Sequence, residues 1–293
     1  MTYRSGFCCF VGRPNAGKST LTNALVGSKI VITSDKPQTT RHAVRGIVTR
    51  EDAQLVLVDT PGLHRPRTLL GERLNDVVRS TLAEVDVVGF CVPATERIGP
   101  GDKFIAAELA ELKAPVVAVV TKTDIASKRQ VAEQLLAVSQ LGDFADVVPV
   151  SAVSGHQVDL LAGLLTTHLP EGPMLYPDDV ETDNDVETRI AELVREAALR
   201  DVRDELPHSI AVTVDEVRRR DSGLQEVFAT IHLERDSQKG IVIGPKGSRL
   251  KQIGVTARAG IEALLGEKVH LALHVAVEKE WQRDPKKLDR LGF

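Results

Sequence analysis

One short segment near the start of the chain constrains the fold more than any other. An apolar run at residues 7–11 precedes Gly-Arg-Pro-Asn-Ala-Gly-Lys-Ser-Thr at positions 12–20, and a run with helical spacing follows. This order predicts a strand, a glycine-rich turn and a helix. Gly12 and Gly17 allow backbone conformations in which successive N–H groups converge on one point, where the positive end of the helix adds to them. The segment therefore predicts a loop that binds a phosphate chain.

Within this loop the residue types match the chemistry of a nucleoside triphosphate bound with Mg²⁺. Lys18 would bring a full positive charge to the outer phosphates, and the Ser19 hydroxyl is placed to bind the metal ion. An ordinary glycine-rich turn would not need Lys and Ser at this spacing. We expect the whole segment to contact the nucleotide: Gly12, Arg13, Pro14, Asn15, Ala16, Gly17, Lys18, Ser19 and Thr20.

A second phosphate-contacting element follows the apolar stretch at residues 54–58. That stretch runs into Asp59-Thr60-Pro61-Gly62, and a strand that ends in Asp before a glycine turn is typical of nucleoside triphosphatases. Asp59 would hold the Mg²⁺ shell, and the Gly62 amide would meet the terminal phosphate. All four residues are predicted to line the nucleotide. A strand-end Asp in an ordinary turn is the alternative.

Strands and helices alternate up to about residue 170. Valine-rich apolar runs and helical patterns take turns along this part, at residues 85–92, 102–112, 115–120, 128–141, 146–150 and 157–169. Nearly continuous apolar runs are typical of a parallel sheet covered on both faces. We predict a doubly wound α/β domain whose binding site lies at the carboxyl ends of the strands. Cys8, Cys9 and Cys91 fall in predicted strands, and we expect reduced core thiols there.

The strand predicted at residues 115–120 runs into Thr121-Lys122-Thr123-Asp124, which resembles the N-K-x-D element of GTPases. The Asp124 carboxylate can accept hydrogen bonds from both the ring N–H and the exocyclic amine of guanine, a pair that adenine does not offer. Lys122 would lay its aliphatic stem along the base plane. Guanine is therefore the predicted base.

Thr121 departs from the GTPase pattern, in which an Asn side chain ties this segment to the phosphate loop. Thr has a shorter reach and one donor, and a lost neutral hydrogen bond is worth about 0.5–1.5 kcal/mol. We expect weaker nucleotide binding with an unchanged base. Further along the chain, Ser151 and Ala152 resemble the S-A element whose backbone N–H meets the guanine carbonyl.

The composition of the chain changes after residue 171. Between residues 171 and 188 the chain carries seven acidic residues and neither Lys nor Arg, which indicates a solvated spacer. Repulsion of RNA phosphates from a hinge is the alternative. We predict a nucleotide-binding domain at 1–171, an acidic linker at 172–186 and a second domain at 187–293.

The second domain has the element order of a KH domain. A helical pattern, two alternating stretches, a Gly-Pro-Lys-Gly loop, a further helical pattern and a strand follow one another at residues 186–206, 209–217, 224–233, 244–247, 253–265 and 268–277. The loop would lie between two short helical segments, and the predicted order, α-β-β-α-α-β, is that of the type II topology. In such domains the G-x-x-G loop clamps the backbone of about four single-stranded nucleotides.

Charge supports this interpretation of the second domain. The whole chain carries a net charge of −4, yet residues 239–293 hold eleven basic and six acidic side chains. Trp281 suits the domain core and an RNA base equally well. The predicted RNA contacts are Gly240, Ile243, Gly244, Pro245, Lys246, Gly247, Arg249 and Lys251.

Together these motifs resemble the Era family of ribosome-associated bacterial GTPases over the whole chain. The resemblance implies a first switch segment at residues 36–42, in which Thr40 coordinates Mg²⁺, with Thr39 as the alternative. It also implies a second switch segment at residues 59–64. Catalysis would rest on Lys18, Thr40 and Gly62, and the metal ion on Ser19, Thr40 and Asp59.

Leu63 stands where Ras-like enzymes place a water-orienting Gln. The Era family has the same apolar residue, which implies that hydrolysis does not use that glutamine and that intrinsic turnover is slow. Asn15 matches an asparagine that helps to hold K⁺ near the phosphates in related GTPases. A role for Asn15 in shaping the loop remains the alternative.

The resemblance also implies the cofactors and partners. They are GTP or GDP with Mg²⁺, the 3′ end of small-subunit (16S) ribosomal RNA, and the maturing 30S subunit. We expect a cytoplasmic monomer that associates peripherally with the inner face of the cell membrane. The N-terminus shows no signal-peptide pattern, and no apolar run approaches the roughly 20 residues that span a bilayer.

Two other classes of protein stay open on the sequence. A P-loop ATPase or small-molecule kinase would let ATP compete with GTP, and Asp124 argues against it. A constitutive RNA chaperone with a structural nucleotide would bind RNA equally well with GDP and with a non-hydrolysable GTP analogue.

Overall fold

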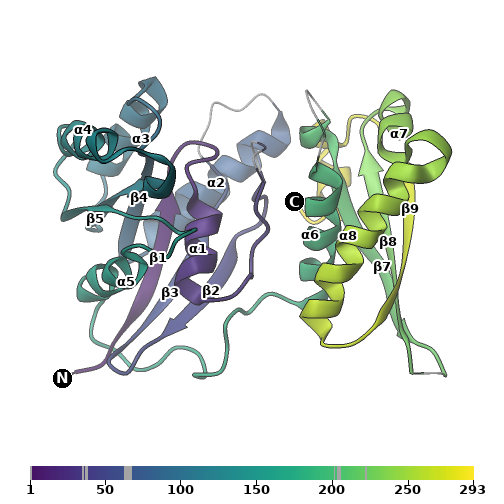
Figure 1. The fold of residues 1–293 in the computed structure, drawn as a ribbon, viewed down its shortest axis with the longest axis horizontal. Coiled ribbons are helices and arrows are strands. Elements are labelled where there is room, and N and C mark those ends of the chain that lie inside the picture. Colours follow the sequence, from purple (N-terminus) through teal and green to yellow (C-terminus); the bar gives the residue numbers. More distant parts are fainter. Residues whose placement is uncertain are drawn as a thin grey trace. The chain divides into compact units, whose positions relative to one another are not determined.

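The structure is a computed structural model that describes residues 2–34, 36, 39–62, 68–200, 202, 206–221 and 223–293. The chain divides into two compact units, which consist mainly of residues 1–183 and of residues 184–293. Each unit has its own β-sheet (Figure 1). Over the described ranges, every helix is too short or too polar to cross a bilayer.

The first unit is built on a six-stranded sheet in the order β2-β3-β1-β4-β5-β6. All neighbouring strands run parallel except β2 and β3, which pair antiparallel. The strand bounds are β1 Arg4–Val11, β2 Val44–Thr49, β3 Ala53–Asp59, β4 Val87–Pro93, β5 Val116–Thr121 and β6 Asp146–Pro149. This confirms the doubly wound α/β prediction.

Helices cover both faces of this sheet (Figure 1). Alternate residues of β1 enter different cores: Cys8 and Phe10 pack with α1 and α5, whereas Cys9 and Val11 pack with α2, α3 and α4. The helix bounds are α1 Lys18–Val26, α2 Leu69–Glu84, α3 Pro100–Ala110, α4 Lys128–Ser139 and α5 Val158–Thr167, with a short 3₁₀ turn, η1, at Thr123–Ile125.

The helix α2 was not predicted from the sequence, although its signal is present there. Leu70, Leu74, Val78 and Leu82 recur every fourth residue, and all four are buried in the structure. This spacing lines one face of a helix. The expectation for the cysteines is confirmed, because Cys8, Cys9 and Cys91 are free, buried thiols. Burial raises the pKa of both Cys9 and Cys91 to about 12.

The second unit confirms the predicted KH order. Its three-stranded sheet has the order β7-β8-β9, with β7 antiparallel and β9 parallel to β8. The apolar faces of α6, α8 and the sheet share one core, which includes Val194, Ile231 and Ile261. The bounds are α6 Val186–Leu199, η2 Pro207–Ser209, β7 Ala211–Arg219, β8 Gln225–Leu233, α7 Asp236–Ile243, η3 Pro245–Gly247, α8 Ser248–Leu265, β9 Val269–Val277, η4 Trp281–Arg283 and α9 Pro285–Arg290.

Two helices differ from the prediction. The helix expected at residues 186–206 ends at Leu199, because Arg200 adopts an extended conformation (φ −63°, ψ 137°). The helix after the G-x-x-G loop begins at once, at Ser248, and runs for 18 residues rather than forming a short segment. The loop therefore sits directly at the N-terminus of a long helix.

Trp281 belongs to the core of the second unit. Its side chain is fully buried, and its indole N–H donates to the Ser209 carbonyl at 3.2 Å. The indole also stacks on the Phe293 ring, with 5.5 Å between the ring centroids. Of the two roles left open by the sequence, the structure supports the one in the core.

The acidic segment at residues 171–183 lies along the first unit. Its acidic side chains are exposed, as a solvated spacer requires. Its backbone is held nonetheless, since the Ile47 amide donates to the Glu181 carbonyl at 2.9 Å. The buried Gln54 side chain accepts from the Tyr176 amide and donates to the Tyr176 carbonyl, both at 2.9 Å. The predicted limits of the linker, 172–186, stay a prediction.

Candidate functional site

The predicted phosphate loop connects β1 to α1 at the carboxyl edge of the sheet. A Cβ atom at Gly12 would lie 2.5 Å from the Cys91 carbonyl oxygen, so a larger residue does not fit there. Asn15 and Gly17 both have left-handed backbone conformations, with φ of 63° and 88°. Gly17 is also the N-cap of α1. The loop thus wraps around the positive end of this helix, as a phosphate site requires.

Lys18 lies in the first turn of α1 with its ammonium group buried. The Nζ atom is 3.3 Å from the Gly12 carbonyl oxygen and 3.4 Å from that of Arg13. Burial lowers the pKa of Lys18, and the charge of Asp59 acts in the opposite direction. Both hydrogen bonds are long and therefore weak, so the ammonium group can exchange them for a phosphate oxygen at little cost in free energy.

The three residues predicted to hold Mg²⁺ meet at one point. The Asp59 Oδ2 atom accepts from Ser19 Oγ at 2.8 Å and from Thr40 Oγ1 at 3.0 Å, and the two hydroxyl oxygens are 2.9 Å apart. Burial raises the pKa of Asp59, while the Ser19 bond and the charge of Lys18 lower it.

This cluster suits a hard divalent cation. Asp59 is completely buried, and its Oδ1 atom has no hydrogen-bond partner among the residues that the structure describes. Oxygen ligands of this kind are the ones that Mg²⁺ prefers, with the remaining positions filled by phosphate and water. The residues present therefore fit the metal ion that the sequence predicts.

The turn after Asp59 closes onto the phosphate loop. A Cβ atom at Gly62 would lie 3.3 Å from both the Lys18 Nζ atom and the Pro14 nitrogen. Glycine therefore lets the turn approach the predicted terminal-phosphate position. Leu63 and His64 of the second switch lie outside the described residues, as do Pro37 and Gln38 of the first.

Thr121 ties the end of β5 to the phosphate loop with its single donor, where the sequence predicts one hydrogen bond fewer than the usual Asn would make. Its hydroxyl donates to the Ala16 carbonyl at 2.7 Å, and the residue is buried. The end of β5 is thereby bound to the phosphate loop through one hydrogen bond. The expectation of weaker binding stays a prediction, but the substitution by Thr leaves the link in place.

Ser151 has a role that the sequence analysis did not foresee. Its hydroxyl donates to the Asp124 Oδ1 atom at 2.7 Å and so orients the predicted base-reading carboxylate. Its amide donates to the His156 carbonyl at 3.0 Å. The Ala152 amide is therefore the donor that we expect to face the base. Lys122, which precedes η1, has a left-handed backbone with φ of 58°.

The G-x-x-G loop of the second unit is tight and strongly curved. A Cβ atom at Gly244 would lie 2.7 Å from the Arg249 Cβ atom, so only glycine fits. Lys246 and Gly247 have φ of 51° and 76°, and the Gly247 amide donates to the Gly244 carbonyl at 3.1 Å. Lys246 and Lys251 are exposed. The loop presents these cations at the positive end of α8.

The guanidinium group of Arg249 already makes a hydrogen bond within the second unit. Its Nη2 atom donates to the Arg200 carbonyl at 2.7 Å. Of the predicted RNA contacts, Gly240 lies on α7 with open space around the position of a Cβ atom, and Ile243 ends that helix. Pro245 begins the short turn η3 that holds Lys246. The structure thus gathers these residues on one loop and its flanking helices.

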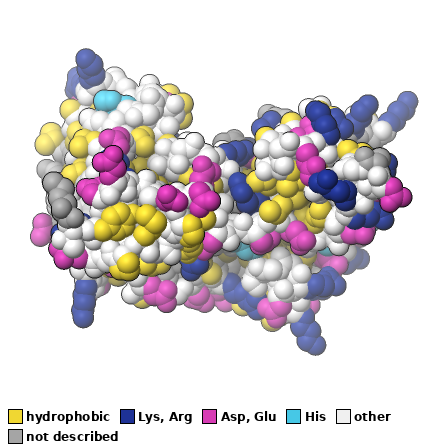
Figure 2. Space-filling view, turned by 90° about the horizontal axis from the view of Figure 1, so that it is seen from below, with side chains coloured by type: hydrophobic (Ala, Val, Ile, Leu, Met, Phe, Trp, Pro, Cys, Tyr) yellow, Lys and Arg dark blue, Asp and Glu magenta, His cyan; other side chains and the backbone are white. Residues whose placement is uncertain are grey.

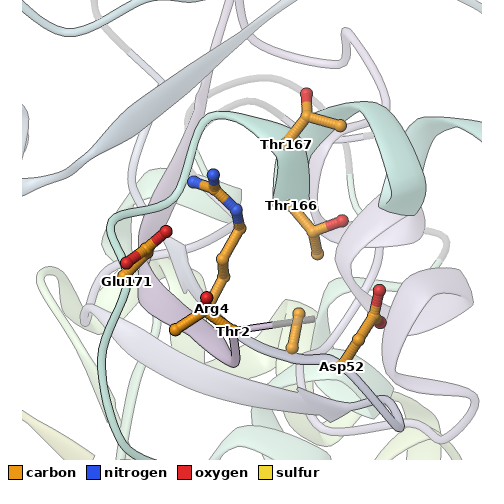
Figure 3. A pocket seen from close by; sticks show the side chains of 7 residues that line it. Thr2, Arg4, Asp52, Thr166, Thr167 and Glu171 are labelled. Atoms are coloured by element: carbon orange, nitrogen blue, oxygen red, sulfur yellow. The ribbon is translucent and has the colours of Figure 1, made fainter.

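A separate cavity of about 360 Å³ lies at the opposite edge of the first unit's sheet. It opens beside the starts of β1 and β3 and the end of α5, and Arg4 faces it from the side opposite Asp52 (Figure 3). Its lining residues are Thr2, Arg4, Asp52, Ala53, Thr166, Thr167 and Glu171. These residues are distinct from those predicted to bind the nucleotide.

Comparison with known families agrees with both halves of this description. Residues 7–122 match the family described as "50S ribosome-binding GTPase", and residues 205–282 match the KH domain family. The fold and the two sites thus define a class of protein, a P-loop GTPase domain followed by a KH domain.

The sequences of known proteins identify the family. GTPase Era of Streptomyces coelicolor is 65% identical over 302 residues, which cover 99% of this chain and 95% of that protein. GTPase Era of Nocardioides sp. is 63% identical, with 99% and 96% coverage. The chain belongs to the Era family of GTPases.

Solved structures agree over the full length. A crystal structure of Era in complex with MgGDPNP and nucleotides 1506–1542 of 16S ribosomal RNA matches with a TM-score of 0.94 at 36% identity, and the match covers 99% of each chain. A variant of Aquifex aeolicus Era bound to GDP and AlF4⁻ matches with a TM-score of 0.95, at the same identity and coverage.

Proposed function

We propose that this chain is a GTP-hydrolysing switch that binds the 3′ end of small-subunit (16S) ribosomal RNA through its KH domain and acts in maturation of the 30S subunit. The observation that carries the proposal is the Ser19–Thr40–Asp59 cluster, which lies in the same chain as a tight G-x-x-G loop. An Era of the same fold was crystallised with MgGDPNP and this part of 16S ribosomal RNA.

Nucleotide binding would draw on the loop at residues 12–20. Its amides and Lys18 would surround the phosphates, while Ser19 and Thr40 would hold Mg²⁺ and Asp59 would orient its water ligands. The bound Mg²⁺ would neutralise charge on the outer phosphates. We propose Lys18, Thr40 and Gly62 as the groups that touch the reacting phosphate, and slow turnover because Leu63 replaces the usual Gln.

We propose that a monovalent cation also binds at this site. Asn15 has a left-handed backbone conformation at the outer turn of the loop, where a K⁺ ion beside the phosphates would replace the charge of an arginine finger. Hydrolysis should then be faster in K⁺ than in Na⁺.

Base selection would rest on Asp124 and its neighbours. Ser151 holds the Asp124 carboxylate at 2.7 Å, so the carboxylate is positioned before guanine arrives. A site built around such a polar pair rejects the wrong base by about 10⁴ or more, which favours a GTPase over an ATPase or kinase. Thr121 links this base site to the phosphate loop through Ala16.

RNA would bind along the G-x-x-G loop. Gly244 and Gly247 let a sugar–phosphate backbone approach closely, and Lys246, Arg249 and Lys251 supply positive charge. On the face that Figure 2 shows, more Lys and Arg side chains project from the second unit than from the first. We also propose a monomer in the cytoplasm that associates peripherally with the inner membrane face.

The most direct test measures the binding of a short strand of the 3′-terminal 16S sequence, together with GTP hydrolysis without and with that strand. We expect the strand to bind the wild-type protein, and Lys246→Glu to weaken that binding without changing basal hydrolysis. Lys113→Glu is the matched control, because it makes the same charge change at an exposed site of the first unit. Equal loss of RNA affinity in both variants would contradict the KH assignment.

A second measurement separates a switch from a constitutive RNA chaperone. RNA affinity is compared between the GDP-bound protein and the protein bound to a non-hydrolysable GTP analogue. We expect tighter RNA binding with the analogue, and identical affinities would favour the chaperone.

A further inference from the structure

The side chain of Arg13 leaves the phosphate loop and binds two acids, Glu96 in the segment between β4 and α3 and Asp102 in the first turn of α3. Its Nε atom donates to the Asp102 Oδ1 atom at 2.8 Å, and its Nη2 atom lies 3.1 Å from the Glu96 Oε2 atom. The Asp102 side chain is completely buried, whereas those of Arg13 and Glu96 are 28% and 45% exposed. The innermost pair is therefore a shielded ion pair.

Asp102 serves two partners at once. Its Oδ2 atom accepts from the Gly99 amide at 2.8 Å, so the same carboxylate caps the N-terminus of α3. The chain also leaves room for Arg13, because a Cβ atom at Gly101 would lie 2.9 Å from the Arg13 Cδ atom. An arginine beside a buried carboxylate makes strong charge-assisted hydrogen bonds, so the start of α3 is a firm anchor.

The backbone of Arg13 stands at the centre of the phosphate loop. Its carbonyl accepts from the Ala16 amide at 3.2 Å and from the Lys18 ammonium at 3.4 Å. Gly12, the preceding residue, is pressed against the Cys91 carbonyl of β4. The loop is thereby fixed at two successive residues, by the ion pairs of Arg13 and by the close approach of Gly12 to β4.

We propose that Arg13, Asp102 and Glu96 form a clamp that positions the phosphate loop, so that phosphate binding depends on the β4–α3 segment and the first turn of α3. The clamp keeps the Arg13 carbonyl where it aligns Lys18 and the loop amides before nucleotide binds. It contributes through preorganisation, because an unclamped loop has to be ordered when the nucleotide arrives. The inference rests on the proposed assignment of residues 12–20 as the phosphate-binding loop.

The test measures affinity for GDP and, by competition, for guanosine, which has no phosphates. Arg13→Met removes every donor of the clamp, and we expect GDP affinity to fall by about tenfold, the effect of one charge-assisted hydrogen bond. Guanosine affinity should stay unchanged, since Asp124 and Ser151 are untouched. A loss confined to the phosphate-bearing ligand is not expected from general destabilisation of the domain.

A double variant separates positioning from folding. Arg13→Met alone deprives the buried Asp102 carboxylate of its arginine partner, which destabilises the fold. Adding Asp102→Asn removes that buried charge and should restore the thermal unfolding temperature, while GDP affinity stays reduced. Recovery of both quantities in the double variant would show that the pair serves stability alone and would overturn the clamp.

Two further variants complete the comparison. Glu96→Gln removes the charge of the more exposed acid of the clamp and should weaken GDP binding by less than Arg13→Met. Arg129→Gln breaks an exposed ion pair with Glu133 on α4, where the side chains are 88% and 60% exposed, and should change nothing. Wild-type GDP affinity in both Arg13→Met and Glu96→Gln would refute the clamp.

A last variant, Lys18→Ala, distinguishes a wrong clamp from a wrong assignment of the phosphate loop. If Lys18→Ala abolishes GDP binding but the Arg13 and Glu96 variants bind normally, the phosphate loop is correctly assigned and the clamp is wrong. If Lys18→Ala also binds GDP like the wild type, the assignment of the loop itself fails.

Discussion

Each unit of this protein carries a glycine-rich loop that leads into a helix, and the two loops use the same backbone device differently. Residues 12–17 enter α1, and residues 244–247 enter α8. In both, a glycine in the left-handed conformation caps the helix: Gly17 has φ of 88° and Gly247 has φ of 76°. Both loops therefore place backbone donors at a helix N-terminus, an arrangement that favours the binding of an anion.

The lysines of the two loops show the difference. Lys18 is buried between the Gly12 and Arg13 carbonyls, whereas Lys246 is exposed. A buried cation at a fixed position suits a compact triphosphate. An exposed cation on a curved loop suits a long phosphate backbone, where many modest contacts add up. Enclosure concentrates binding free energy in a few residues, and exposure spreads it along a surface.

The largest effect that this comparison predicts is for Lys18→Met. The variant keeps the length and the apolar stem of the side chain but removes a buried charge from the outer phosphates. We expect GDP and GTP affinity to fall by roughly 100-fold, from the loss of a hydrogen bond to a charged group in a shielded site. Isothermal titration calorimetry would measure it. A loss of less than threefold would contradict the enclosed role of Lys18.

Thr121→Val tests how strongly the phosphate and base sites are joined. The change removes the hydroxyl that donates to the Ala16 carbonyl, and a lost neutral hydrogen bond is worth about 0.5–1.5 kcal/mol. We expect up to about tenfold weaker GDP binding in a fluorescence titration, with the preference for guanine over adenine retained. The opposite change, Thr121→Asn, should bind GDP at least as tightly as the wild type.

Lys246→Ala tests the exposed loop. Removing one exposed phosphate contact should lower RNA affinity only a few-fold and reduce the log–log salt slope by about 0.7, the value for a single strand. Filter binding at several salt concentrations would measure both quantities, with Lys113→Ala as the control. A 100-fold loss would show that the KH loop encloses its ligand as the phosphate loop does.

The smallest predicted effects concern pH, and they have opposite signs in the two units. Burial raises the pKa of Asp59, so the folded state holds its proton longer than the unfolded state. The contribution of Asp59 to the stability of the ligand-free protein should therefore fall as the pH rises above about 3.8. The difference in unfolding temperature between wild type and Asp59→Asn, followed against pH, would reveal it. If that difference did not change with pH, the raised pKa of Asp59 would be contradicted.

In the second unit, Arg220 and Arg218 bind Glu226 and lower its pKa to about 2 from 4.5. This carboxylate therefore stabilises the fold above pH 4.5, and the contribution is lost as the pH falls towards 2. Glu226→Gln should lower the unfolding temperature at pH 7 and differ little from the wild type near pH 2. The same difference in unfolding temperature at both pH values would contradict the lowered pKa of Glu226.

Much of the fold could be predicted because its signals are local. The runs of apolar residues in β1, β4 and β5 follow from burial on both faces of a parallel sheet, and the G-x-x-G loop falls between the expected strands and helices. The end of α6 at Leu199 was not predicted, because the apolar period continues past it in the sequence. The backbone pairing of residues 171–183 was also missed, since its partner strand lies far away along the chain.

The sequence by itself predicted which residues would meet the phosphates and the base, because Lys18, Asp59 and Asp124 belong to motifs whose spacing reflects the ligand. Only the tertiary structure decided how these groups are held. Thr121 bonds to Ala16 across 105 positions, and Arg13 bonds to Asp102 across 89. Such pairs leave no periodic pattern, because their geometry exists only once β1, β4 and β5 lie side by side in the sheet.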